Sequence, residues 1–134
     1  MNNNHSKENT EIEINAITVQ IITSIISIGT IFISILLLYN QQLEMEGKET
    51  FLTAKQTQKL STFNRTLILI IVIVFLVINY ILYKISKEEG EDLTPYTLQI
   101  IASLLTVVAG IIGLYVVLRE RQGEQLVDVE NPIF

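Results

Sequence analysis

Hydroxyl and amide side chains interrupt an otherwise apolar stretch in the first third of the chain. They recur mostly every three or four residues, which places them on one face of a helix. Such side chains donate and accept hydrogen bonds, so they can join helices inside a membrane or line a water-filled lumen. We call this set the first stripe, and it consists of Gln20, Thr23, Ser24, Ser27, Thr30 and Ser34.

One segment of this region occurs twice. Residues 18–24 read TVQIITS and residues 97–103 read TLQIIAS, so the copies are 79 positions apart, as from Gln20 to Gln99. At that offset the polar or small residues of the first stripe correspond to small or polar ones, which predicts a duplicated helix. Small residues four apart also let helix backbones approach closely. The second stripe consists of Gln99, Ala102, Ser103, Thr106, Ala109, Gly110 and Gly113.

Both stripes lie in apolar blocks long enough to cross a bilayer, which takes roughly 20 residues. The blocks are residues 16–39, 66–83 and 97–118, and 49% of the chain is hydrophobic. In lipid a helix satisfies its own backbone groups. We therefore predict an all-α integral membrane protein with three transmembrane helices in a bundle, the first and third being a parallel internal repeat. We expect the two stripes to face each other, with Gln20 and Gln99 at similar depth and within hydrogen-bonding reach; a symmetric oligomer would use the same faces.

The polar segments around these blocks predict the remaining organisation. Residues 1–15 are acidic and aperiodic, so we expect a disordered tail before a transmembrane domain over residues 16–122. Residues 43–65 are predicted to form a helical extension of the second span or an interfacial helix, after a helix end at Gly47. Residues 123–134 form a carboxy-terminal tail whose last residues could dock on a partner: Asn131, Pro132, Ile133 and Phe134.

Other side chains suggest little chemistry. The spans contain no His, Lys or carboxylate that could activate a nucleophile, so we predict that the chain is not an enzyme. Cysteine is absent, and His5 has no partner at metal-ligand spacing. The acidic residues between 88 and 92 lack the spacing of a calcium loop. We expect no cofactor or metal, and the net charge of −5 argues against a nucleic-acid partner. Asn79, inside the second span, is expected to bond to another helix.

The distribution of Lys and Arg sets the expected orientation. Six basic residues flank the first connector and the end of the third span, and three flank the opposite side. The prediction is a multi-pass protein of the cell membrane with its amino terminus outside and its carboxy terminus in the cytoplasm. The abundance of Ile, Asn and Lys is typical of a bacterial or phage protein from an AT-rich genome.

Two functional hypotheses follow from these features. The first is a non-catalytic accessory, scaffold or assembly subunit that acts through helix packing, with the bilayer, a homo-oligomer or another membrane protein as partner. The second is an oligomeric pore-former or small channel. In this reading the chain resembles phage holins in general build, with three spans and the same predicted orientation, and the resemblance implies that the Ser and Thr residues would line a lumen. Close helix contact is the commoner use of small residues at this spacing.

Overall fold

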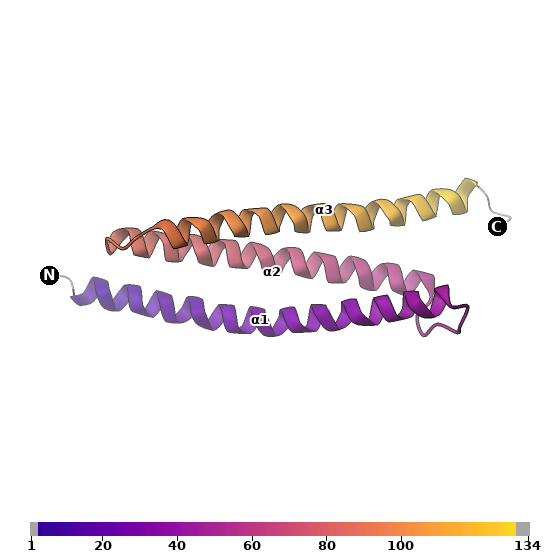
Figure 1. Ribbon diagram of the computed structural model, residues 1–134, viewed down its shortest axis with the longest axis horizontal. Coiled ribbons are helices and arrows are strands. Elements are labelled where there is room, and N and C mark those ends of the chain that lie inside the picture. The colour runs from indigo at the N-terminus through magenta and orange to yellow at the C-terminus, as the bar shows by residue number, and fades with distance from the viewer. Residues whose placement is uncertain (1–2, 131–134) are drawn as a thin grey trace.

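The computed structural model consists of three long helices joined by two short connectors (Figure 1). α1 spans Asn3–Met45, α2 spans Ala54–Glu88 and α3 spans Thr94–Glu130. The structure describes the backbone of residues 3–130 and the side chains of residues 7–120. All three helices are long and apolar enough to cross a membrane. The prediction of an all-helical chain with three such helices is confirmed, and the chain has the build of a small multi-pass membrane protein.

Glycine ends the first two helices, as predicted. Gly47 and Gly90 have φ angles of +71° and +72°, in the left-handed region that glycine adopts without strain. The following amides donate back into the helices, Lys48 N to Leu43 O and Glu91 N to Ser86 O. This arrangement satisfies carbonyl groups that the end of a helix would leave without a partner.

α2 begins well before its apolar block. Thr53 caps it, because its hydroxyl accepts a hydrogen bond from Gln56 N while the Gln56 side chain accepts one from Thr53 N. This reciprocal capping box satisfies two amides at the helix start. Of the two alternatives for residues 43–65, the structure therefore has the helical extension of the second span, over residues 54–65, whereas residues 43–45 belong to α1.

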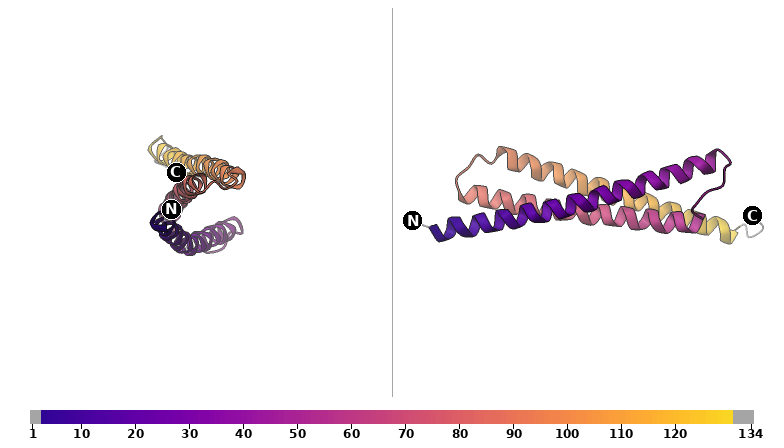
Figure 2. Two further views of the ribbon diagram at one scale, coloured as in Figure 1. Left: turned by 90° about the vertical axis from the view of Figure 1, so that its left-hand side faces the viewer. Right: turned by 90° about the horizontal axis from the view of Figure 1, so that it is seen from below.

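The helices form a row in which α2 lies between α1 and α3 (Figures 1 and 2). Among the described residues, no Cα of α1 lies within 8 Å of a Cα of α3. The expectation that the two repeat helices pack face to face is therefore wrong. Two short connectors make each consecutive pair of helices an antiparallel hairpin. Each outer helix buries its packing face against α2, and within the described part of the chain the two outer helices do not contact each other.

Buried residues of α2 recur every seven positions. Its buried positions include Asn64, Ile71, Ile78 and Ile85. On α3 the residues with reduced exposure alternate at spacings of three and four, as at Ser103, Val107, Gly110, Leu114 and Val117. This 3.5-residue period is typical of helices that coil around each other and interdigitate their side chains. α2 thus packs on both neighbours although its sequence is apolar all round.

Both predicted tails contain helix in the structure. α1 starts at Asn3, so the expectation of a disordered segment over residues 1–15 is corrected for the residues from Asn3 onward. Asn9 and Ala16 are buried, so tertiary packing stabilises the polar first turns of α1. α3 continues to Glu130, through Glu124, Gln125 and Leu126, which are good helix formers.

Candidate functional site

The first stripe is largely a contact surface for α2. Thr23 and Thr30 are buried, Gln20, Ser27 and Ser34 are half-buried, and α2 is the helix that α1 contacts. Ser24 is the exception, because it is exposed on the side of α1. We call the buried set, with Ala16 at its start, the α1 seam: Ala16, Gln20, Thr23, Ser27, Thr30 and Ser34.

The hydroxyl groups of the α1 seam find acceptors within their own helix. Thr23 Oγ1 donates to Val19 O at 2.7 Å and Ser27 Oγ to Thr23 O at 2.9 Å. Thr30 Oγ1 donates to Ser27 O at 2.7 Å and Ser34 Oγ to Thr30 O at 3.0 Å. Such back-bonding satisfies a hydroxyl without water. The seam can therefore be polar in composition and still pack dry against an apolar helix.

Asparagines fasten α1 to α2 near the first connector. Asn64 is 3% exposed, and its Nδ2 donates to Ser34 Oγ at 3.0 Å. Asn40 accepts a hydrogen bond from Leu52 N at 3.1 Å and donates to Thr57 Oγ1 at 3.4 Å. None of these bonds is predicted from the sequence. The signal for Asn64 was its position seven residues before Ile71, since a single Asn in an apolar heptad seam often fixes register.

The second stripe is divided between two faces of α3. Ser103 is buried and accepts a hydrogen bond from Asn79 Nδ2 of α2, so the predicted interhelical bond of Asn79 is confirmed. Gly110 lies directly against α2, because a Cβ there would be 3.2 Å from Leu69 Cδ1. Gln99, Ala102, Thr106 and Ala109 are exposed.

Gly113 makes room for a charged side chain. A Cβ at this position would lie 3.4 Å from Nη1 of Arg65, which extends from α2 along α3. Arg65 precedes the apolar block of α2 by one residue, so its aliphatic stem can cover apolar surface while its guanidinium approaches the membrane boundary. Gly113 therefore serves an intramolecular contact.

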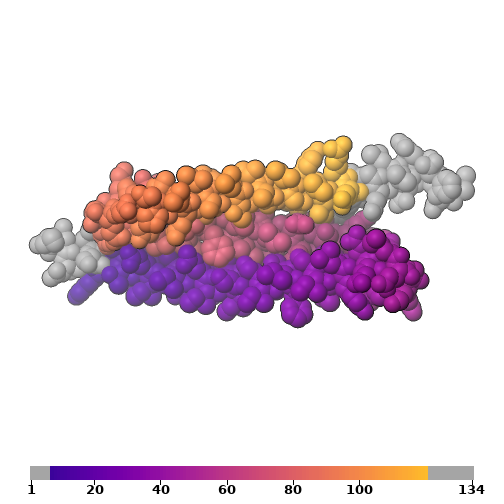
Figure 3. Space-filling view, in the orientation of Figure 1, coloured from indigo at the N-terminus to yellow at the C-terminus, as the bar shows by residue number. Residues whose placement is uncertain are grey.

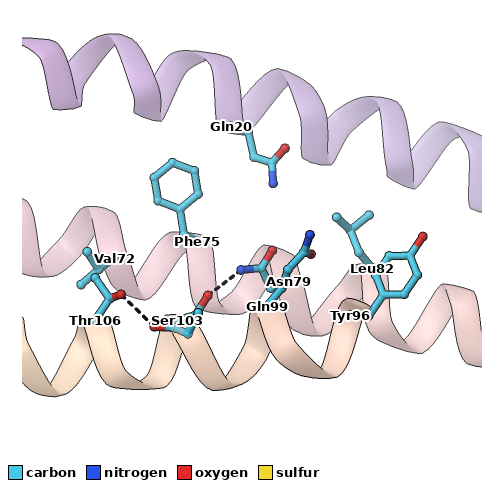
Figure 4. A pocket seen from close by; sticks show the side chains of 10 residues that line it. Gln20, Val72, Phe75, Asn79, Leu82, Tyr96, Gln99, Ser103 and Thr106 are labelled. Carbon is cyan, nitrogen blue, oxygen red and sulfur yellow. Dashed lines mark hydrogen bonds between the residues drawn. The ribbon is translucent and has the colours of Figure 1, made fainter. Parts of the chain in front are cut away.

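An open groove runs between α1 and α3 with α2 as its floor (Figure 3). It has a volume of about 490 Å³. Gln20 of α1 points into it across from Gln99 of α3 (Figure 4), so the expectation that these residues lie at a similar depth is confirmed. Among the described residues neither amide has a hydrogen-bond partner, so the predicted bond between them is absent. The groove thus presents amide and hydroxyl groups within the apolar blocks: Gln20, Asn79, Gln99, Ser103 and Thr106.

Carboxylates from two segments meet around the α2–α3 turn. A hydrogen bond with Glu91 raises the pKa of Glu89 above its ordinary value, and partial desolvation and the nearby charge of Glu13 on α1 act in the same direction. The Asn9 side chain opposes this shift. Hydrogen bonds from the Thr94 backbone and hydroxyl lower the pKa of Asp92. Within residues 7–120, no three acidic or His side chains are arranged to hold a metal ion.

These shifts predict opposite pH responses. Because the pKa of Glu89 is raised, its contribution to stability is fully present below pH 4.5, the ordinary pKa of glutamate. That contribution is lost as the pH rises through the raised pKa. Because the pKa of Asp92 is lowered, its contribution to stability is fully present above pH 3.8, the ordinary pKa of aspartate. That contribution is lost as the pH falls through the lowered pKa. We expect carboxyl-carbon NMR to give a midpoint above 4.5 for Glu89 and below 3.8 for Asp92.

The variant Glu91→Gln tests the cause of the Glu89 shift. It replaces a competing carboxyl group with a neutral amide, which can donate a hydrogen bond to ionised Glu89, so the Glu89 midpoint should fall while that of Asp92 stays. An unchanged Glu89 midpoint in Glu91→Gln would contradict the assignment.

The proposed docking tail, Asn131, Pro132, Ile133 and Phe134, lies outside the described residues. Within the described residues, the groove and the exposed part of the second stripe are polar features that lie in the apolar blocks. Comparison of the chain with protein-family models, with curated proteins and with solved structures gives no match, so the assignment of function depends on these features.

Proposed function

We propose that the chain is a small non-catalytic membrane protein that acts by packing its helices against other helices, as an accessory, scaffold or assembly subunit. The observation that supports this proposal is the α1 seam. Its hydroxyls donate to carbonyls of α1 itself, and its threonines are buried against α2. A surface used in this way is already occupied within one chain, whereas a lumen would need the same hydroxyls to face water.

The proposal includes an orientation. The turn between α2 and α3 lies outside and the connector between α1 and α2 lies in the cytoplasm, with the cell membrane as the location. Lys55, Lys59 and Arg65 on the connector side support this orientation through the preference of basic residues for the cytoplasmic side.

Cysteine labelling in intact cells tests the proposal, because the natural chain contains no cysteine. Single cysteines replace Ser24, Ser27, Thr106 and Ala109, and a membrane-impermeant maleimide is the probe. We expect all four to stay unlabelled. The control Lys87→Cys should react in intact cells, and the control Glu46→Cys only after permeabilisation.

Two other outcomes would contradict specific parts of the proposal. Labelling of Ser27→Cys, Thr106→Cys and Ala109→Cys, together with dye leakage from vesicles that contain the protein, would support the pore-former instead of helix packing. Reaction of Glu46→Cys but not Lys87→Cys in intact cells would reverse the orientation and leave helix packing in place.

A further inference from the structure

The part of α2 that precedes its own apolar block lies beside the end of the apolar block of α1. Asn64 Nδ2 donates to Ser34 Oγ at 3.0 Å, inside the α1 block. Asn40, the first residue beyond that block, donates to Thr57 Oγ1 at 3.4 Å. The turns of α2 from Thr57 to Asn64 are therefore level with the end of the α1 block, where the hydrocarbon core of a bilayer gives way to the headgroups.

Aromatic side chains lie at the same level. The rings of Tyr39 and Phe51 stack with their centroids 6.1 Å apart, and Phe63 of α2 is 56% exposed. Tyrosine is enriched at the membrane–water interface, because its ring is apolar and its hydroxyl is polar. Tyr39 is the last residue of the first apolar block, so the stacked pair holds the connector close to the membrane boundary.

A second groove opens on the outer surface at this boundary. It has a volume of about 370 Å³, and we call it the connector groove; its lining residues are Leu52, Gln56, Lys59, Leu60 and Phe63. All five belong to α2 or to the connector before it. Gln56, Lys59 and Phe63 are exposed, and the two leucines are half-buried. The connector groove is therefore open to the surroundings of the protein.

The lining of the connector groove changes from polar to apolar toward the membrane core. Gln56 lies next to Thr57, level with the end of the α1 block, and Lys59 follows about one helical turn closer to the core. Leu60 and Phe63 come next, beside the apolar residues of α1. A phospholipid has the same order of polar headgroup, charged phosphate and apolar chain, whereas a soluble protein would leave Leu60 and Phe63 in lipid.

The charge around the connector groove is positive. Between residues 50 and 87 the sequence contains five basic residues and no acidic one. Lys59 forms no ion pair with any of residues 7–120, and Lys55 lies one turn before it on the same side of α2. Lysines at a membrane surface attract anionic lipids, and their alkyl stems can lie along apolar surface.

We propose that the connector groove binds an anionic phospholipid, with the Lys59 ammonium group on the lipid phosphate and Phe63 against the first carbons of an acyl chain. The Gln56 amide donates to headgroup oxygens. Phosphatidylcholine also carries a phosphate, but its choline would bring a third positive charge near Lys55 and Lys59. The connector groove therefore selects phosphatidylglycerol over phosphatidylcholine. This inference goes beyond helix packing and does not depend on it.

Fluorescence quenching by brominated lipids tests the site, because the natural chain contains no tryptophan. Phe63→Trp places a single reporter in the connector groove. Tyr115→Trp places one outside it, on α3, two residues past Gly113, which lies beside Arg65. Brominated phosphatidylglycerol and brominated phosphatidylcholine are compared at equal mole fraction in phosphatidylcholine vesicles. We expect Phe63→Trp to show a preference of about fivefold for phosphatidylglycerol, as one lysine near an anionic surface provides, and Tyr115→Trp to show much less.

Charge variants of the Phe63→Trp chain assign the preference to Lys59. Lys59→Gln should remove most of it, and Lys59→Arg should keep it. Lys48→Gln makes the same change of charge on the same side of the membrane, where Lys48 pairs with Glu46 at 2.9 Å, and should leave the preference unchanged. Native mass spectrometry needs no reporter: the chain with Phe63 should retain phosphatidylglycerol, and Lys59→Gln should lose it.

Three results would overturn the lipid site. Equal quenching of Phe63→Trp by the two lipids would mean that the connector groove does not select an anionic headgroup, and would leave an acidic protein as its occupant. An equal preference at Phe63→Trp and Tyr115→Trp would mean that the whole surface attracts the lipid. An unchanged preference in Lys59→Gln would remove Lys59 as the phosphate ligand. Helix packing is decided by the maleimide labelling of the α1 seam, so the two proposals fail separately.

Discussion

Gly110→Leu is expected to push α3 away from α2 and to lower the free energy of unfolding by about 1–3 kcal/mol, the usual cost of overpacking. A Cβ at Gly110 would already lie 3.2 Å from Leu69 Cδ1, 3.6 Å from Val72 Cγ2 and 3.8 Å from Leu69 Cα. A leucine side chain adds three more carbons in that direction, and the Leu69 backbone cannot move aside. Reversible unfolding in mixed micelles with increasing dodecyl sulfate measures the loss.

Two glycine variants serve as controls for this prediction. Gly29→Leu on α1 should leave stability almost unchanged, because a Cβ there meets no atom within 4 Å. Gly110→Ala should cost far less than Gly110→Leu, since the tip of Leu69 can shift by a few tenths of an ångström. Equal losses for Gly110→Leu and Gly29→Leu would mean that α3 does not pack on α2 through Gly110.

Thr30→Leu is expected to release α1 from α2 over much of its length. Thr30 is 4% exposed, and leucine both enlarges the side chain in a closely packed seam and removes a satisfied hydroxyl. We again expect a loss of about 1–3 kcal/mol. Spin labels at Glu11 and Lys87 provide the readout, because the start of α1 lies far from the connector that tethers it to α2 (Figure 1). The distance distribution should broaden in Thr30→Leu.

Ser24→Leu is the matched control, since Ser24 is exposed on the same helix. It should leave the distance distribution of the natural chain unchanged. If Ser24→Leu broadened the distribution and Thr30→Leu did not, the face of α1 that contacts α2 would have been assigned incorrectly.

The spans and their ends were predictable because they depend on local physical rules. Apolar length predicts which segments can cross a bilayer, and glycine in the left-handed region marks where α1 and α2 end, at Gly47 and Gly90. The polar start of α1 was mispredicted as disorder. Its helix is supported by contacts such as that of buried Asn9 near Glu89, and such long-range contacts are not visible in a local pattern.

The central place of α2 was also missed, because the first and third helices were expected to face each other through their stripes. The information was present in the spacing of Ile71, Ile78 and Ile85, whose seven-residue period predicts a coiled packing seam. The residues of both stripes were identified from the sequence, but the sequence did not show which of them are buried and which are exposed. Ser24 and Thr106 share helical spacing with buried neighbours, and only the rotation of each helix about its axis decides which of them is covered.

The self-contained hydroxyls of α1 also determine how that helix can move. The hydroxyls of Thr23, Ser27 and Thr30 donate to carbonyls of α1 itself, so donor and acceptor move together. A small shift of α1 relative to α2 therefore breaks none of these hydrogen bonds. Near the first connector, by contrast, Ser34 accepts a hydrogen bond from Asn64 of α2, and Asn40 bonds to Leu52 and Thr57. Among the described residues, no side-chain hydrogen bond joins the stretch of α1 from Thr23 to Thr30 to α2, so these central turns can shift along α2 without breaking one.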